Sequence, residues 1–318
     1  MSVWKMCDIR KIKNFACATK KEQIHFFGSF DFVILDLDGV VWIGFQPLPG
    51  AVDCLNNLKK LGKSVNFVSN NTTASPERMA GILIKSNVLI KVENIFTPTL
   101  AYITFLKNIK FSKTLFVIGF KTLKEEFKKA GFKVAENTPY PIGEDVESIA
   151  NSVVDDEEIG AVIMDIDVNL TYIQLQKAST YLKRKDCLFI TGAGDRALPF
   201  PRIGPLIGNY VFIETIKQIS GREPQQLAKP SVEFSNFIKE KLSITDPQKV
   251  LFIGDSIDDD MKFATNSGYQ KLIVLTGVTK KKDLDNWKKD EIDKPQYYIE
   301  SLKALNLILE MLQNIKDN

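Results

Sequence analysis

The sequence predicts an α/β protein built around a parallel sheet, from three observations. Short and continuously apolar runs recur along the chain, and amphipathic segments separate them. Strands that are apolar on both faces are typical of a parallel sheet covered by helices on both sides. The length of 318 residues exceeds one typical compact domain and suits two.

The first strand–helix–strand unit of this pattern begins with the run FVIL (32–35), which predicts a strand. After the turn sequence PLPG, the segment AVDCLNNLKKLG (51–62) carries leucines at helical spacing and ends at a glycine suited to a C-cap. The run VNFVS (65–69) predicts the next strand. A single helical crossover between two strands predicts that they are parallel and connected with a right hand.

The same alternation continues to the end of the chain. In the helix predicted from TYIQLQKASTYLKRK, we expect Tyr172, Leu175, Ala178 and Leu182 to face inward. The further predicted strands are 114–119, 160–167, 187–191, 249–255 and 271–277, and the further predicted helices are 123–131, 171–185, 209–220, 231–242 and 301–315.

Composition argues against several classes of protein. Lys plus Arg number 42 and Asp plus Glu number 39, so the near balance of charge gives no reason to expect a nucleic-acid partner. No apolar stretch approaches the roughly 20 residues of a membrane span, so no membrane partner is expected. The only histidine is His25, which disfavours mechanisms that need a histidine base.

The cysteines favour a reducing compartment. They are far apart, and none forms a CxxC pair, so neither a disulfide framework nor a structural zinc site is expected. The basic N-terminal stretch has no apolar segment of signal-peptide length, and we expect it to be an extension on a cytoplasmic protein. The four cysteines are Cys7, Cys17, Cys54 and Cys187.

Polar groups that can carry chemistry follow four of the apolar runs, in ILDLDG, FVSNN, LAKP and FIGDSIDDD. Ligands of open α/β sheets bind outside the carboxyl ends of the strands, so these groups are expected to converge there if their strands are neighbours. The expected set is Asp36, Asp38, Ser69, Asn70, Asn71, Lys229, Asp255 and Asp260.

Such a set suits phosphoryl transfer with a divalent cation. Several carboxylates brought together repel one another unless a cation lies among them, and Mg²⁺ is the common choice where phosphate is also bound. A lysine, a hydroxyl and backbone N–H groups supply donors for an anion. One carboxylate can then attack phosphorus, and a second can transfer protons.

The motifs DLDGVVW, SNN, KP and GDSIDDD, in this order, resemble those of the haloacid dehalogenase-type phosphatases. The resemblance runs from about residue 30 to the C-terminus and is strongest to the branch of p-nitrophenylphosphatases and phosphoglycolate phosphatases, which includes pyridoxal phosphatase. It implies a Rossmann-like parallel-sheet core with an inserted α/β cap domain. It also implies a Mg²⁺-dependent phosphatase, with relatives that often pair through their caps.

The resemblance also implies roles for individual residues. Asp36 would be the nucleophile and Asp38 the general acid/base, and both, with Asp255, would bind the metal. Asp260 would support the metal site. Phosphate would be bound by Ser69, Asn70, Asn71 and Lys229.

The cap implied by the resemblance would lie between the SNN and lysine motifs, where the chain is far longer than one crossover needs. The family's substrate loop resembles TNxD, whereas this chain reads TGAGD followed by RALPF, so Asp195 and Arg196 are only candidates for substrate contact. The expected segments are an N-terminal extension (1–27), a first segment of the core domain (28–107), the cap (108–207) and a second segment of the core domain (208–318).

Other interpretations stay open at this stage. The aspartates can be turn formers after a strand, Asp258 and Asp259 can be helix N-terminal charges, and Trp42 is expected to pack rather than to stack on substrate. Other function classes are a phosphorylation-dependent receiver module, a phosphomutase or phosphotransferase, and an inactive phospho-ligand-binding relative. If the chain is a phosphatase, the expected substrates are p-nitrophenyl phosphate, small acids like phosphoglycolate, and pyridoxal phosphate.

Overall fold

The computed structural model describes residues 12–136, 141–198 and 204–316, which fall into two compact units. Residues 1–11, with Cys7, lie outside the described residues. The divisions between the two units include 69/70 and 237/238. The cap is expected at 108–207, and the expected domain boundaries stay a prediction. Unit 1 is Met1–Ser69, Met79–Ile95 and Ile238–Asn318, and unit 2 is Asn70–Arg78 and Phe96–Phe237.

Unit 1 contains a seven-stranded sheet with the order β1-β15-β14-β13-β2-β5-β6. Each neighbouring pair from β1 to β5 is parallel, which confirms the predicted parallel-sheet α/β fold. The strand β2 lies between β13 and β5, so the polar residues that follow these three strands leave the sheet side by side. The strands are β1 (Lys13–Asn14), β2 (Phe32–Leu35), β5 (Ser64–Val68), β6 (Ile95–Phe96), β13 (Val250–Gly254), β14 (Gln270–Val274) and β15 (Tyr297–Ile299), with a separate hairpin of β3 (Trp42–Ile43) and β4 (Gln46–Pro47).

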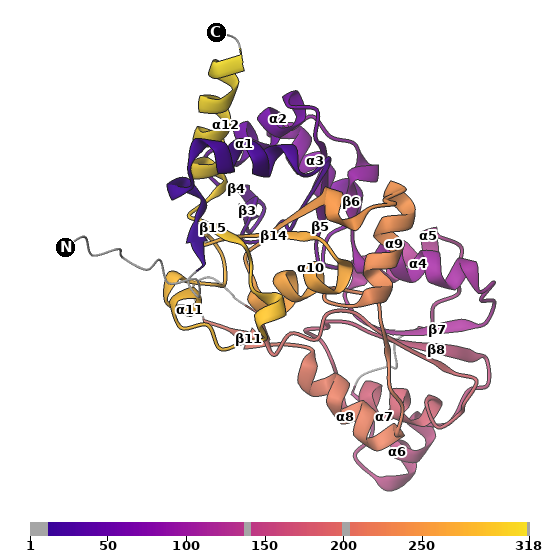
Figure 1. The fold of residues 1–318 in the computed structure, drawn as a ribbon. Helices are drawn as coiled ribbons and strands as arrows, with labels where there is room; N and C mark the ends of the chain where they lie inside the picture. Colours follow the sequence, from indigo (N-terminus) through magenta and orange to yellow (C-terminus); the bar gives the residue numbers. More distant parts are fainter. Residues whose placement is uncertain (1–11, 137–140, 199–203, 317–318) are drawn as a thin grey trace. The chain divides into compact units, whose positions relative to one another are not determined.

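Helices cover the sheet of unit 1, and the central strands are accordingly apolar on both faces. Val33, Ile34 and Leu35 of β2 are fully buried. In Figure 1, α2 and α12 lie together on one side of β14, and α10 lies on the other side. The helices are α1 (Lys20–Gly28), α2 (Ala51–Lys60), α3 (Pro76–Lys85), α9 (Val232–Leu242), α10 (Lys262–Ser267), α11 (Lys281–Asp285) and α12 (Leu302–Lys316), of which α3 and α9 cross points of division between the units.

The described part of the N-terminal stretch is built into unit 1. The strand β1 pairs with β15 at the sheet edge, and Phe15 is fully buried. The ring centroid of Phe15 lies 4.7 Å from that of Phe26 and 5.1 Å from that of Tyr297. The helix α1 begins with a capping box, in which Thr19 and Glu22 satisfy each other's backbone N–H groups. Residues 13–28 therefore contribute a strand and a helix to this unit.

Unit 2 contains a four-stranded parallel sheet with the order β12-β9-β8-β7 and a small hairpin of β10 and β11. Its core includes Phe116, Val162 and Tyr181. The strands are β7 (Thr114–Ile118), β8 (Ile159–Met164), β9 (Leu188–Thr191), β10 (Ala197–Leu198), β11 (Leu206–Ile207) and β12 (Gln225–Gln226), and the helices are α4 (Pro98–Asn108), α5 (Lys121–Lys129), α6 (Val146–Ser152), α7 (Tyr172–Tyr181) and α8 (Tyr210–Ser220).

One expectation for α7 is wrong. Ala178 and Leu182 are fully buried as expected, but the side chain of Tyr172 is 73% exposed. A helix turns by about 100° per residue, which places Tyr172 about 120° away from Ala178 and about 180° away from the buried Tyr181. Tyr172 therefore points to solvent from the first turn.

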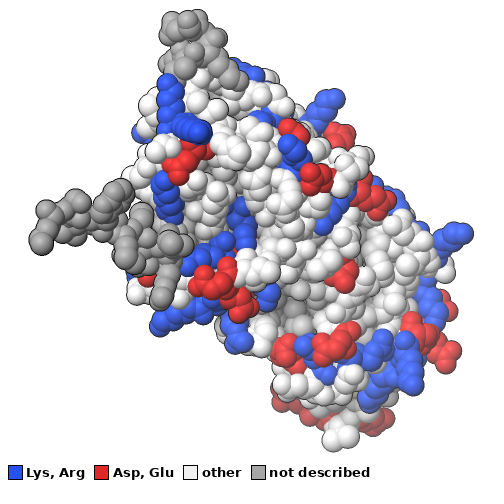
Figure 2. Space-filling model, in the orientation of Figure 1, with Lys and Arg blue, Asp and Glu red and all other residues white. Residues whose placement is uncertain are grey.

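The surface carries charges of both signs. On the face shown in Figure 2, Lys and Arg side chains are interspersed with Asp and Glu side chains. None of the helices in the described segments has the length and apolar character needed to cross a membrane.

Candidate active site

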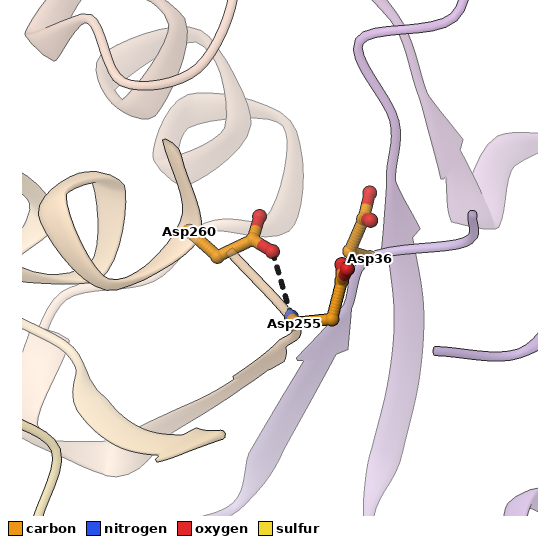
Figure 3. Close-up of side chains that lie close together, drawn as sticks. All are labelled: Asp36, Asp255 and Asp260. Carbon is orange, nitrogen blue, oxygen red and sulfur yellow. Dashed lines mark hydrogen bonds between the residues drawn. The ribbon is translucent and has the colours of Figure 1, made fainter. Parts of the chain in front are cut away.

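Three carboxylates come together at the carboxyl ends of two neighbouring strands of unit 1. Asp36 follows β2 and Asp255 follows β13, and the backbone N–H of Asp36 donates to the carbonyl of Ile253 at 2.9 Å. Asp36, Asp255 and Asp260 each offer one oxygen, and these oxygens all lie within 4.8 Å of one another (Figure 3). All three residues are buried, with exposed fractions of 7%, 3% and 1%.

Asp260 holds the loop that carries Asp255. Its Oδ2 accepts the backbone N–H of Asp255 at 2.9 Å (Figure 3). The same oxygen accepts the backbone N–H of Ser256 at 3.0 Å. The backbone of Gly254 also packs directly on Asp260, because a Cβ at that glycine would lie 2.3 Å from the Cβ of Asp260. Asp260 therefore orients Asp255 while it adds a third carboxylate to the group.

Two glycines allow the backbone to approach the Asp255 carboxylate. Val278 donates its N–H to Oδ2 of Asp255 at 2.6 Å, and Thr279 donates to the carbonyl at 2.9 Å. A Cβ at Gly277 would lie 1.8 Å from Oδ2, and one at Gly39 would lie 2.7 Å from it. Gly39, the glycine of DLDG, also has a φ of +87°, a conformation that other residues rarely adopt. Both positions therefore require glycine.

Asp38 lies in a tight turn just beyond Asp36. The carbonyl of Leu37 accepts from Val41 at 2.9 Å and from Trp42 at 3.0 Å, which closes the turn. Trp42 is fully buried, as expected for a packing residue, but its indole N–H also donates to Oδ1 of Asp38 at 3.0 Å. The sequence interpretation missed this bond, although the spacing of four residues across a glycine turn is a signal for it.

The carboxylate group fits a hard divalent cation. Its donors are oxygen atoms, which Mg²⁺, Mn²⁺ and Ca²⁺ prefer over nitrogen or sulfur. Three buried carboxylates repel one another in a medium of low dielectric, and a bound cation offsets this repulsion. Asp36, Asp255 and Asp260 are the residues that would hold it.

The expected phosphate-binding residues are divided between the two units. Ser69 is buried at the end of β5, next to β2 in unit 1, while Asn70, Asn71 and Lys229 belong to unit 2. Within unit 2, the amide of Asn70 donates to the carbonyl of Lys229 at 3.2 Å and accepts its N–H at 2.9 Å. Lys229 is 3% exposed, and a lysine is rarely buried so fully unless it has a partner.

The remaining candidates have other contacts. Asp258 is exposed and forms an ion pair with Lys289 at 2.6 Å, and Asp259 accepts the hydroxyl of Ser256 at 3.2 Å. The guanidinium carbon of Arg196 lies 4.1 Å from the centre of the Tyr210 ring. Asp258 and Asp259, the first two aspartates of the DDD run, are therefore not part of the carboxylate group.

Comparison with known families agrees with the motifs. Residues 33–133 match the haloacid dehalogenase-like hydrolases, and residues 226–305 match a related family described as HAD-hydrolase-like. The two matched regions contain the carboxylate group and the lysine motif.

Similar proteins extend over almost the whole chain. A 4-nitrophenylphosphatase of Schizosaccharomyces pombe is 32% identical over 298 residues, which are 91% of this chain and 97% of the relative. Phosphoglycolate phosphatase 2 of Arabidopsis thaliana is 30% identical over 89% of this chain and 95% of its own length. The structure of a p-nitrophenyl phosphatase from Archaeoglobus fulgidus has a TM-score of 0.75 at 28% identity and covers 88% of this chain and 99% of its own. These similarities confirm the resemblance expected from the motifs: the chain belongs to the haloacid dehalogenase-like hydrolases, in the branch that holds the 4-nitrophenylphosphatases and phosphoglycolate phosphatases.

Proposed function

We propose that the chain is a Mg²⁺-dependent phosphatase that hydrolyses small phosphomonoesters through an aspartyl-phosphate on Asp36. The observation that carries the proposal is the buried group of Asp36, Asp255 and Asp260, whose oxygens lie within 4.8 Å of one another. Membership in a hydrolase family with phosphatase relatives supports the same reaction.

The reaction would run in two steps and use Asp36 and Asp38, which are two residues apart in the sequence. In the first, an oxygen of Asp36 forms a bond to phosphorus, the bond from phosphorus to the leaving oxygen breaks, and Asp38 gives that oxygen a proton. In the second, Asp38 takes a proton from water and the water oxygen forms a bond to phosphorus. The bond from phosphorus to the Asp36 oxygen breaks, which releases phosphate and restores the Asp36 carboxylate. A bound Mg²⁺ supplies positive charge that offsets the carboxylates and the phosphoryl oxygens.

Phosphate binding is proposed for Ser69, Asn70, Asn71 and Lys229. The lysine would neutralise phosphate charge, and the hydroxyl and amide groups would donate hydrogen bonds. The paired hydrogen bonds between Asn70 and Lys229 support this assignment, because they join two of the four residues across 159 positions of sequence.

The proposed substrates are small phosphorylated acids like phosphoglycolate first and pyridoxal phosphate second. The names of the relatives, 4-nitrophenylphosphatase and phosphoglycolate phosphatase, support the first choice. Asp195 and Arg196 remain candidates for contact with the organic part of the substrate. Comparing kcat/KM across a panel of phosphorylated metabolites with Mg²⁺ tests this order, and a preference for phosphosugars or nucleotides would refute it.

We also propose a reducing, cytoplasmic location. Cys17, Cys54 and Cys187, the three cysteines among the described residues, are free thiols, which supports a reducing compartment. Fluorescence microscopy of the tagged full-length chain tests this location, and an organellar signal would contradict it.

The variant Asp36→Asn tests the covalent mechanism. We expect p-nitrophenyl phosphate turnover to fall at least about a thousandfold, because an amide cannot replace the nucleophilic carboxylate. Asp258→Asn is the matched control, since Asp258 is exposed and paired with Lys289 outside the carboxylate group. Retained activity in Asp36→Asn, with an unchanged circular dichroism spectrum, would remove the aspartyl-phosphate from the mechanism.

A further inference from the structure

A second buried carboxylate lies in unit 2, outside the proposed reaction. Asp165 follows β8 and is 5% exposed. Its Oδ1 accepts the hydroxyl of Thr72 at 2.8 Å and the backbone N–H of Ile166 at 2.7 Å. Its Oδ2 accepts the hydroxyl of Tyr102, from α4, at 2.8 Å. One carboxylate thus joins three segments that are far apart in the sequence.

Burying this group carries a cost. All three donors are uncharged, and burial raises the pKa of Asp165 even though the bonds from Tyr102, Ile166 and Thr72 favour the charged form. The backbone also comes very close, because a Cβ at Gly192 would lie 2.2 Å from Oδ2. The three hydrogen bonds that Asp165 accepts offset part of the cost of burying the carboxylate.

Asp165 holds the chain next to the proposed phosphate-binding residues. Thr72 directly follows Asn70 and Asn71, so its hydroxyl anchors the chain one residue beyond them. The side-chain oxygen of Asn71 accepts the backbone N–H of Thr73, the residue that follows Thr72, at 2.8 Å. The side chain of Asn70 is in turn bonded to the backbone of Lys229.

The segment that leads to Lys229 packs at the same edge of the unit 2 sheet. Leu227 donates its N–H to the carbonyl of Thr191 at 2.9 Å, and the amide of Gln226 donates to Gly192 at 3.3 Å. Gly192 is the residue whose backbone meets the Asp165 carboxylate. Both chain segments that carry proposed phosphate ligands in unit 2 are therefore tied to the surroundings of Asp165.

We propose that Asp165 is a positioning residue for phosphate, which acts by holding Thr72 and thereby fixing Asn70, Asn71 and the bonded Lys229. The proposal rests on the proposed function, because it assigns phosphate binding to these residues. The bond from Thr72 transmits the effect, whereas the bond from Tyr102 serves the packing of α4.

The test compares two hydroxyl donors on one carboxylate. The dissociation constant of inorganic phosphate is measured by calorimetry with Mg²⁺ for the wild type and for Thr72→Val, Thr72→Ser and Tyr102→Phe. We expect about tenfold weaker binding in Thr72→Val, and values within about twofold of wild type in Thr72→Ser, which keeps the hydroxyl, and in Tyr102→Phe. With p-nitrophenyl phosphate, Thr72→Val should raise KM more than it lowers kcat.

Several results would overturn the proposal. Unchanged phosphate binding in Thr72→Val would do so, as would an equal loss in Tyr102→Phe, which would reduce the cluster to a packing role. If Thr72→Val does not fold, Asp165→Asn replaces it, since a carboxamide has one acceptor oxygen for three donors, and wild-type binding there would refute the proposal.

The wild type separates this proposal from the proposed function. Phosphate binding without turnover of any phosphomonoester would refute the proposed function. The positioning role would then be decided by the phosphate dissociation constants of the variants relative to that of the wild type. No phosphate binding by the wild type would overturn the positioning role.

Discussion

The indole N–H of Trp42 donates a 3.0 Å hydrogen bond to Oδ1 of Asp38, the second aspartate of the DLDG motif. The indole is fully buried, and Gly39 donates its N–H to the carbonyl of Trp42 at 2.8 Å, so the turn is closed from both sides. A rigid and buried donor of this kind limits the orientations of a carboxylate that is only half-buried itself. Trp42 thus positions the proposed general acid/base.

The variant Trp42→Phe keeps an aromatic ring and removes the donor. We expect kcat/KM to fall about tenfold for an alkyl phosphate such as phosphoglycolate and by less for p-nitrophenyl phosphate, whose leaving group needs little help from an acid. Phe45→Leu is the control, because Phe45 packs on the Trp42 ring at 5.4 Å without bonding to Asp38. Equal losses for the two substrates would argue against a role in proton transfer.

Gly277→Ala should weaken the proposed metal site. Its Cβ would lie 1.8 Å from Oδ2 of Asp255, so that carboxylate cannot keep its present position beside Asp36 and Asp260. We expect Mg²⁺ to activate the variant only at concentrations at least about tenfold higher, as measured by Mg²⁺ titration of p-nitrophenyl phosphate turnover. Gly28→Ala is the control, since nothing lies within 4 Å of a Cβ there. A wild-type titration curve for Gly277→Ala would contradict this.

The buried Asp165 should make stability depend on pH. Its folded-state pKa is raised by burial above an unfolded value of about 3.9, so the protonated form is favoured in the folded state. The contribution of Asp165 to the free energy of unfolding is fully present below about pH 4 and is lost as pH rises through the folded-state pKa. The loss is about 1.4 kcal/mol for each pH unit that separates the folded-state and unfolded-state pKa values. In urea unfolding, the stability of wild type minus that of Asp165→Asn should therefore shrink from pH 4 to pH 7. A difference that grows with pH would show that the sign is wrong.

Phe15 should matter for the stability of unit 1 although it lies near the N-terminus. The side chain is fully buried against Phe26 and Tyr297, so Phe15→Ala should cost about 3–5 kcal/mol in the free energy of unfolding. Ile24→Ala on α1 is the control, because Ile24 is 53% exposed and should change stability by less than about 0.5 kcal/mol. Similar small effects in both variants would mean that β1 and α1 add little to the fold.

The sequence predicted the elements whose signal is local. FVIL and KVLFIGD became β2 and β13 because a run that is apolar on both faces suits a covered parallel strand. The strand β1 has two residues and β15 has three, too few for any period to show, so neither was predicted. Their place in the sheet depends on pairing with distant strands.

The site was predictable to the extent that it follows strand ends. Asp36 and Asp255 were expected together because parallel neighbours end at one edge, and their oxygens do lie together. The sequence extended the GAVIMDID strand to residue 167, whereas β8 ends at Met164, so Asp165 stands at a strand end like Asp36 and was overlooked. The bond from Trp42 to Asp38 depends on a glycine turn, which apolar periodicity does not reveal.

Mn²⁺ soaked into crystals of the wild-type protein tests the central claim most directly, since oxygen ligands accept Mn²⁺ as well as Mg²⁺ and Mn²⁺ is visible by its anomalous scattering. We predict a strong anomalous peak bonded to oxygens of both Asp36 and Asp255. A map with no peak between these two carboxylates, or with the peak at another group of residues, would contradict the proposed metal-dependent phosphatase.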